Sequence, residues 1–308
     1  MKIVFFGSDD FASKNLESLV SSGHEVLACV TQPDRPKGRD LKIALPMPKI
    51  VSGKYGIDVL QPKDLKNAGF LENLKSYDAD LFVVIAYGRI LTKEILDIPK
   101  MFSINVHGSL LPKYRGAAPI NWVIINGDEK TGITIAKIDQ KLDSGDILKQ
   151  KELEIKKDDT SATLRARMID ESIDFLLNCL SDIKNNNISF QKQDSSKVSI
   201  APKLTKDLGC IDWNKSAFKI HNLIRGLRPW PSAYTKYNGK LLKILEAEVL
   251  DQDSTAPGEI LDVSKQGFVV GTQDKVLLVK RVHLESSKPM DAASFVAGHK
   301  IESGTILG

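Results

Sequence analysis

The chain has 308 residues, more than one domain usually holds, and its 42% hydrophobic and 27% charged residues are typical of a globular protein, so we expect two domains. Its longest apolar run, residues 81–86, is too short to cross a bilayer, and three scattered cysteines without metal-ligand spacing favour a cytoplasmic protein that holds no metal. The net charge of +4 excludes a uniformly basic protein, although basic residues gather in two stretches.

The first half of the chain alternates strand and helix patterns. Apolar runs predict strands at residues 2–6, 25–31, 80–86 and 102–107, and the alternation of apolar and polar residues predicts a further strand at 132–138. Amphipathic periodicity predicts helices at residues 11–22, 64–76 and 159–184. This order is typical of an α/β fold, so we expect an open, mostly parallel sheet with helices on both faces over residues 1–184.

A glycine follows the first strand, but its surroundings do not favour a dinucleotide. Gly7 is followed by Ser-Asp-Asp-Phe and lacks the Gly-x-Gly-x-x-Gly spacing that lets backbone approach a pyrophosphate. We therefore expect neither a nicotinamide cofactor nor ATP. In open sheets of this kind a ligand still binds beyond the carboxyl ends of the strands.

The loop after the second strand is rich in Pro, Gly and basic residues. Residues 31–56 hold six Lys or Arg against two Asp, a net charge of +4, and such a loop is a poor core element. An ordinary surface loop and an arm that grips a polyanion fit this composition equally well. The candidate basic contacts are Arg35, Lys37, Arg39 and Lys42.

The most informative residues lie at the end of the strand at 102–107. Asn105 and His107 are two residues apart, so both side chains leave the same face of the strand. Asp143 lies in a Gly-containing turn between two later strand patterns, where it could meet the histidine, and Asp146 is its rival. An amide, an imidazole and a carboxylate together can stabilise an oxyanion and move a proton. The alternative interpretation is that Asn105 and His107 only cap a turn or form a polar pair whose hydrogen bonds are satisfied.

The pattern changes after residue 184. Residues 185–205 are polar and suit a linker. Short strand patterns then recur, separated by turn residues, which predicts a small five-stranded barrel resembling the oligonucleotide-binding (OB) fold over residues 206–308. The strands are expected at residues 232–237, 241–250, 258–263, 267–271 and 276–282. Residues 203–243 carry nine Lys or Arg against two Asp, a net charge of +7.

Three segments carry a resemblance to a known family. Residues 103–112 (Ser-Ile-Asn-Val-His-Gly-Ser-Leu-Leu-Pro), residues 113–119 (Lys-Tyr-Arg-Gly-Ala-Ala-Pro) and residues 142–146 (Leu-Asp-Ser-Gly-Asp) together resemble the 10-formyltetrahydrofolate-dependent formyltransferases. Residues 31–42 are similar to the insertion loop of the branch of that family that acts on methionyl initiator tRNA. The resemblance covers nearly the full chain and is thinnest after residue 245.

The resemblance implies a Rossmann-like catalytic domain, a formyl donor in the form of 10-formyltetrahydrofolate, and roles for particular positions. The catalytic residues that it implies are Asn105, His107 and Asp143. The residues that it implies for folate binding are Ser109, Leu110, Leu111 and Pro112. Arg39 is the main expected tRNA contact, supported by Arg35, Lys37 and Lys42, and Asp40 departs from the basic continuation that is frequent in the family.

The function that follows is formyl transfer to the amino group of methionyl initiator tRNA by a monomer, with the second domain binding tRNA. Two alternatives keep the same catalytic residues, namely transfer to a small amine such as glycinamide ribonucleotide or a nucleotide-linked amino sugar, and hydrolysis of the folate. A non-catalytic RNA-binding protein is a third alternative. It would leave Asn105, His107 and Asp143 unexplained.

Overall fold

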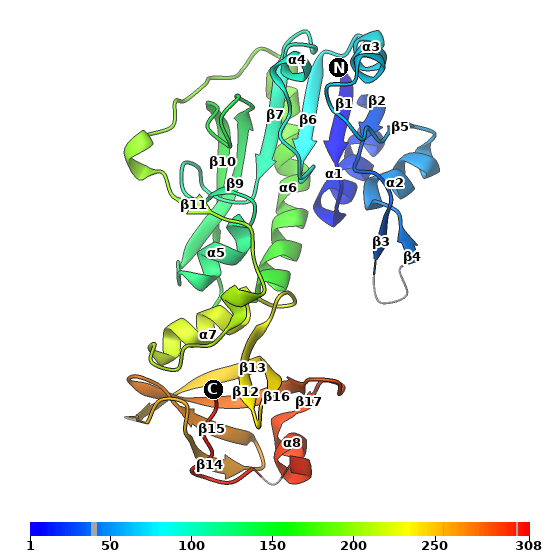
Figure 1. The fold of residues 1–308 in the computed structure, drawn as a ribbon. Helices are drawn as coiled ribbons and strands as arrows, with labels where there is room; N and C mark the ends of the chain where they lie inside the picture. Colours follow the sequence, from blue (N-terminus) through cyan, green and yellow to red (C-terminus); the bar gives the residue numbers. More distant parts are fainter. Residues whose placement is uncertain (38–41, 255, 300) are drawn as a thin grey trace. The chain divides into compact units, whose positions relative to one another are not determined.

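The computed structural model describes residues 1–37, 42–254, 256–299 and 301–308 (Figure 1). The chain forms two compact units, each built from several stretches of sequence. The first unit comprises Met1–Ala117, Thr131–Leu153 and Ala166–Ala201. The second unit comprises Ala118–Lys130, Glu154–Arg165 and Pro202–Gly308.

A seven-stranded sheet with the order β10-β9-β7-β6-β1-β2-β5 is the centre of the first unit. Its strands are β1 (Lys2–Gly7), β2 (Glu25–Val30), β5 (Asp58–Leu60), β6 (Leu81–Ile85), β7 (Phe102–His107), β9 (Lys130–Lys137) and β10 (Ile147–Glu154). Parallel pairing joins β5, β2, β1, β6 and β7 in this spatial order, and β9 is antiparallel to β7. β1 and β6 are largely apolar because helices cover both faces of the sheet.

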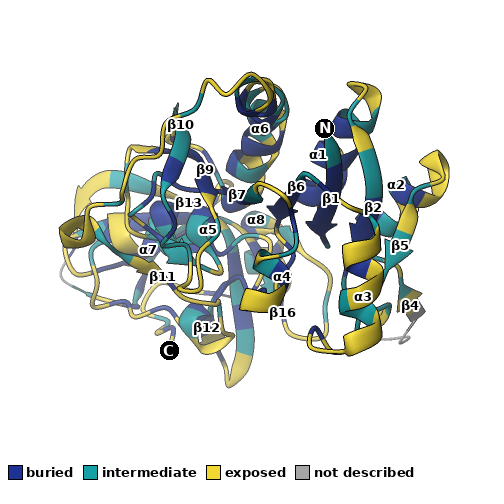
Figure 2. Cartoon of the chain, turned by 90° about the horizontal axis from the view of Figure 1, so that it is seen from above, coloured by how far each residue is buried: buried dark blue, intermediate teal, exposed yellow. Residues whose placement is uncertain are grey.

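The helices that cover this sheet are α1 (Asp10–Ser21), α2 (Met47–Tyr55), α3 (Ala68–Ser76), α4 (Lys93–Leu96) and α6 (Ser161–Lys184). Figure 2 shows α1 and α6 on one side of the buried central strands and α3 and α4 on the other. Asn15 on α1 donates a hydrogen bond to Ser172 on α6 at 2.8 Å, which joins the two helices of one layer. Asp9 caps the N-terminus of α1, because its carboxylate accepts a hydrogen bond from the amide of Ala12.

The longest helix, α6, has 24 residues and is amphipathic. Its buried residues recur every three or four positions, which lays one apolar stripe against the sheet. They include Met168, Leu176, Cys179, Leu180 and Ile183. Within the described part of the chain, no helix combines the length and the hydropathy that a bilayer span requires.

Two short strand pairs lie outside the main sheet. The first is a hairpin of β3 (Arg35–Lys37) and β4 (Lys42–Ala44), which forms the two arms of the basic insert after β2. The second pairs β8 (Arg115–Gly116) in parallel with β11 (Ile200–Ala201). A single turn of 3-10 helix, η1 (Ser195–Lys197), precedes β11.

The second unit holds an antiparallel sheet in which β12-β13-β16-β15-β14 are neighbours and β17 pairs with β16. The strands are β12 (Ala233–Tyr237), β13 (Lys240–Asp253), β14 (Ile260–Ser264), β15 (Gly267–Gly271), β16 (Lys275–Leu284) and β17 (Met290–Asp291). The unit also contains α5 (Pro119–Ile125), η2 (Asp207–Gly209), α7 (Ala217–Gly226) and α8 (Ala292–His299). Its core includes Trp213, Ile220, Phe268 and Phe295.

The predicted fold class is confirmed: a mostly parallel sheet flanked by helices is followed by a small antiparallel, barrel-like sheet domain. Most of the segment predicted as a linker, residues 185–205, belongs to the first unit. That unit extends to Ala201 because the segment pairs with β8 through its backbone.

Candidate active site

β7 carries Asn105 and His107 to the carboxyl end of a parallel strand. Strand pairing places Asn105 opposite Ala136 and His107 opposite Thr134 on β9. Between them, Val106 points into the core and is 4% exposed. Asn105 is half-buried and His107 is 6% exposed, so the strand end presents an amide and a nearly enclosed imidazole.

The turn at Asp143 approaches this strand end across 38 residues of sequence. Asn105 Nδ2 donates to Asp143 Oδ1 at 3.3 Å, and the backbone amide of Gly116 donates to Asp143 Oδ2 at 2.8 Å. His107 Nδ1 lies 3.7 Å from Asp143 Oδ2. The structure thus brings the three predicted catalytic side chains together in one site.

The hydrogen bonds of His107 define its tautomer. Its Nε2 lies 2.9 Å from the carbonyl oxygen of Tyr114, which accepts only, so Nε2 carries a proton. Nδ1 therefore faces the carboxylate of Asp143, bare in the neutral ring and protonated in the imidazolium. At 3.7 Å the two groups are beyond hydrogen-bond distance, so Nδ1 makes no hydrogen bond with Asp143.

Backbone geometry fixes the two loops that meet in the site. Asp143 and Tyr114 both have left-handed conformations, with φ values of 47° and 60°. At Gly145, a Cβ atom would lie 1.8 Å from the carbonyl oxygen of Lys137, so only glycine allows the turn to pack on the end of β9. Gly116 has φ of 124°, and a Cβ atom there would meet the carbonyl oxygen of Ala201 at 2.6 Å.

Residues 109–112, predicted to bind folate, form a wall beside His107 that is fixed mostly by hydrogen bonds to the rest of the unit. Ser109 is fully buried and its hydroxyl donates to the carbonyl oxygen of Lys113 at 2.6 Å. Leu111 packs with Ala136 and Ile147, and the peptide bond before Pro112 is cis. Leu110 and Pro112 are half-buried and are the more open members of the segment.

Thr134 on β9 holds this wall, so we expect Thr134→Val to lower the free energy of unfolding by about 2 kcal/mol. Its hydroxyl accepts from the Leu111 amide at 3.0 Å and from Gln150 Nε2 at 2.9 Å, and it donates to the Ser109 carbonyl at 2.6 Å. Urea unfolding measures the effect. Thr131→Val is the matched control, because the buried hydroxyl of Thr131 has no hydrogen-bond partner among the described residues. Equal losses in both variants would contradict the assignment.

Comparison with known proteins adds to this geometry. Residues 1–180 match the formyl transferase family, and residues 203–300 match the C-terminal domain of formyl transferases. The chain is 45% identical to the methionyl-tRNA formyltransferase of Clostridioides difficile (strain 630) and 44% identical to that of Acetivibrio thermocellus, covering 100% of itself and of each relative. The chain belongs to the formyl transferase family.

This formyltransferase shares its fold with more distant members whose structures are known. One is an N-formyltransferase from Helicobacter canadensis in complex with folinic acid and dTDP-3-aminofucose. The TM-score is 0.69 at 20% sequence identity, and the match covers 91% of this chain and 99% of that one. At this identity the likeness concerns the fold alone.

The structure describes the two short strands of the basic insert, β3 and β4. Arg35 is exposed on β3, while Arg39 and the side chains of Lys37 and Lys42 lie outside the described residues. The base of the insert is anchored by Asp34, which accepts from Lys49 at 2.7 Å and from Gln61 at 2.8 Å. The exposed apolar residues on and just after β4 were not anticipated from the sequence. They are Ile43, Leu45, Met47 and Ile50.

Tyr87 is 2% exposed in the core against Phe6, and burial raises the pKa of its phenol. Arg89 donates to the carbonyl oxygens of Pro62 and Lys63. Trp230 is 50% exposed in the second unit. Sequence reasoning missed Gln193 and Ser199, which contact the site from the polar segment before Pro202.

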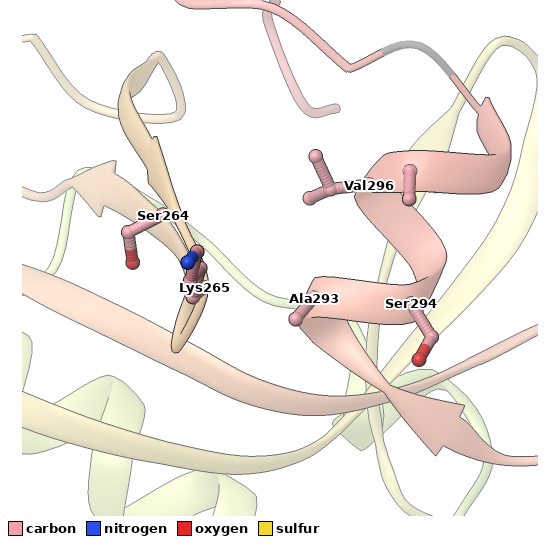
Figure 3. A pocket seen from close by; sticks show the side chains of 6 residues that line it. Ser264, Lys265, Ala293, Ser294 and Val296 are labelled. Atoms are coloured by element: carbon pink, nitrogen blue, oxygen red, sulfur yellow. The ribbon is translucent and has the colours of Figure 1, made fainter.

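A separate hollow of about 500 Å³ lies in the second unit, between the β14–β15 turn and α8 (Figure 3). Lys265 and Ser264 stand on the turn side and Val296 on the helix side, and its lining offers no acid–base pair. We assign the hollow no role in catalysis. Within the described ranges, no three His, Cys, Asp or Glu side chains gather as a metal site, and the expectation of a metal-free enzyme stays a prediction.

Proposed function

We propose that this formyltransferase transfers the formyl group of 10-formyltetrahydrofolate to the free amino group of methionyl initiator tRNA. The observation that carries the proposal is the 45% identity to a methionyl-tRNA formyltransferase over the whole of both chains. The meeting of Asn105, His107 and Asp143 at one strand end supports it independently, because this set of groups suits acyl transfer.

In this reaction the neutral amine attacks the formyl carbon of the folate. A bond forms between the amine nitrogen and the formyl carbon, the carbonyl electrons move to oxygen, and a tetrahedral oxyanion results. The oxyanion collapses by breaking the bond to N10, which leaves with a proton. The amine loses its own proton, so the site needs donors for the oxyanion and a group that accepts a proton.

The chain's own residues fit these needs. The amide of Asn105 has a second hydrogen beyond the one directed at Asp143, and it is a donor for the oxyanion. The imidazolium form of His107 supplies a second donor at Nδ1, which lies 3.7 Å from Asp143 Oδ2 and is not hydrogen-bonded to it. The Asp143 carboxylate steadies that positive charge and accepts the amine proton, directly or through a water.

Substrate contacts follow from the same proposal. Ser109, Leu110, Leu111 and Pro112 form an apolar and main-chain wall for the flat pterin. Arg35, Lys37, Arg39 and Lys42 bind the acceptor end of the tRNA from an insert whose base is anchored through Asp34. The domain at residues 206–308 binds tRNA through its basic first third. We propose that the enzyme acts as a monomer in the cytoplasm.

The test is formyl transfer measured side by side with four acceptors: methionyl initiator tRNA, the same tRNA uncharged, a nucleotide-linked amino sugar, and water. We expect formylmethionine from the charged tRNA and no folate turnover with the other three. Transfer to the amino sugar, or turnover in water alone at a similar rate, would contradict the proposed acceptor while leaving the catalytic residues in place.

A further inference from the structure

The polar segment at residues 191–201 forms backbone hydrogen bonds with both loops that build the site. At its start, Gln191 exchanges two backbone hydrogen bonds with Ile147, at 2.8 and 2.9 Å, just after the Asp143 turn. At its end, the carbonyl oxygens of Ser199 and Ala201 accept from the amides of Arg115 and Ala117, both at 2.9 Å. The segment therefore spans the distance between the Asp143 turn and β8.

Gln193 lies between these two sets of backbone hydrogen bonds, and its side-chain amide uses all of its hydrogen-bonding positions. Its Nε2 donates to the carbonyl oxygens of Asp143 at 2.8 Å and Gly145 at 2.7 Å. Its Oε1 accepts from Arg115 Nε at 3.1 Å and Nη2 at 2.7 Å. An amide with two donors and two lone pairs is fully satisfied by this set, so its orientation is fixed.

These contacts close a ring around Asp143. From the backbone of Asp143 the ring passes through Gln193 to Arg115, and then to Gly116, whose amide donates to the Asp143 carboxylate at 2.8 Å. The side chain of Asp143 is thus held directly by β8, and its main-chain carbonyl is held through Gln193, which accepts from Arg115 of β8. The left-handed backbone of Asp143 is otherwise uncommon for a residue with a side chain, and the ring keeps it in place.

We propose that Gln193, paired with Arg115, is a positioning residue that aims the carboxylate of Asp143 at His107 and Asn105. The proposal rests on the proposed function, since only there does Asp143 take part in chemistry. Gln193 acts through the carbonyl of Asp143. A displacement of a catalytic group by about 1 Å costs on the order of 10²-fold in rate, so loss of this hold reduces kcat more than substrate binding.

A purely structural role would consist of holding Arg115 and the segment to the first unit. Two substitutions separate the two roles. Gln193→Met keeps the length of the side chain and removes all four hydrogen bonds. Gln193→Glu keeps an acceptor for Arg115, strengthened by charge, but has no hydrogen to donate to the carbonyls of Asp143 and Gly145.

The experiment measures kcat, the KM of each substrate, and the melting temperature for both variants beside the unchanged protein. We expect both to lose about 10- to 100-fold in kcat with each KM within about twofold, and we expect the melting temperature to fall less in Gln193→Glu than in Gln193→Met, because only the former keeps an acceptor for Arg115. The matched control is Gln191→Glu, which places the same charge on an exposed neighbour that pairs through its backbone.

Full kcat in Gln193→Glu would overturn the positioning role, as would a fall in activity that appears in KM alone. If Gln193→Met does not fold, Gln193→Glu decides the question, because it retains the bond to Arg115. If the wild-type protein itself transfers no formyl group to methionyl-tRNA, the proposed function is contradicted. The wild-type measurement made in parallel therefore distinguishes a failure of the proposed function from a failure of the positioning role.

Discussion

Replacing Asp143 by Asn is expected to lower kcat for formyl transfer by about 10²- to 10⁴-fold, the range that general acid–base groups contribute. Asparagine has nearly the same shape, and its oxygen can still accept from the Gly116 amide. It has no negative charge to stabilise the imidazolium of His107, and it cannot take the proton of the attacking amine. The KM values should change little, because this carboxylate acts on reacting groups.

The neighbouring Asp146 supplies the control for that substitution. It lies three residues along the same turn, and the sequence pattern leaves it as a rival. In the structure the carboxylate that meets Asn105 and the Gly116 amide belongs to Asp143. We expect Asp146→Asn to keep kcat close to that of the unchanged protein. If the two variants exchanged their effects, the assignment of the catalytic carboxylate would be wrong.

Asn105→Ala is expected to reduce kcat by about 10²- to 10³-fold, the loss that follows removal of one oxyanion donor. The substitution also removes the hydrogen bond to Asp143 Oδ1, so the carboxylate loses a neighbour that helps to hold it in the site. Steady-state kinetics with both substrates saturating measure the effect on kcat. Binding of folate, followed by fluorescence, should remain.

A control for this variant is available on the same strand. Ser103 lies two residues before Asn105 on the same face of β7 and is 3% exposed. Its hydroxyl has no hydrogen-bond partner among the residues that the structure describes, so Ser103→Ala removes no hydrogen bond there. We expect near-normal kcat from it. If Ser103→Ala lowered kcat as much as Asn105→Ala, any change on this face of β7 would lower kcat, and the amide of Asn105 would have no specific role.

Local pattern is sufficient to predict most of the fold. The apolar runs at residues 2–6 and 80–86 correspond to β1 and β6, because a fully buried parallel strand is apolar along most of its length. The strand predicted at residues 102–107, where apolar and polar residues alternate, corresponds to β7. The stripe of α6 and the five strand patterns after residue 230 are also correct in type and approximate position. The alternation of side chains along a strand is enough to place Asn105 and His107 on one face.

Long-range pairing cannot be predicted in the same way. The segment at 191–201 has no periodicity and is polar, so its composition predicts a linker, yet β11 pairs with β8 and Gln193 reaches the turn of Asp143. The sequence places Thr134 in a strand but does not identify it as the support of residues 109–112, because that contact depends on how two loops fold back on β9. Hydrogen bonds of this kind leave no local signal in composition or spacing.

The most direct test of the central claim is a single-turnover measurement in which enzyme is in excess over methionyl initiator tRNA and saturated with 10-formyltetrahydrofolate. We expect rapid formation of formylmethionyl-tRNA by the unchanged protein. In Asp143→Asn we expect formation to be slowed by at least about a hundredfold, even though that variant still binds both substrates. Equal rates of transfer in the two proteins would contradict the claim that Asn105, His107 and Asp143 form the catalytic site.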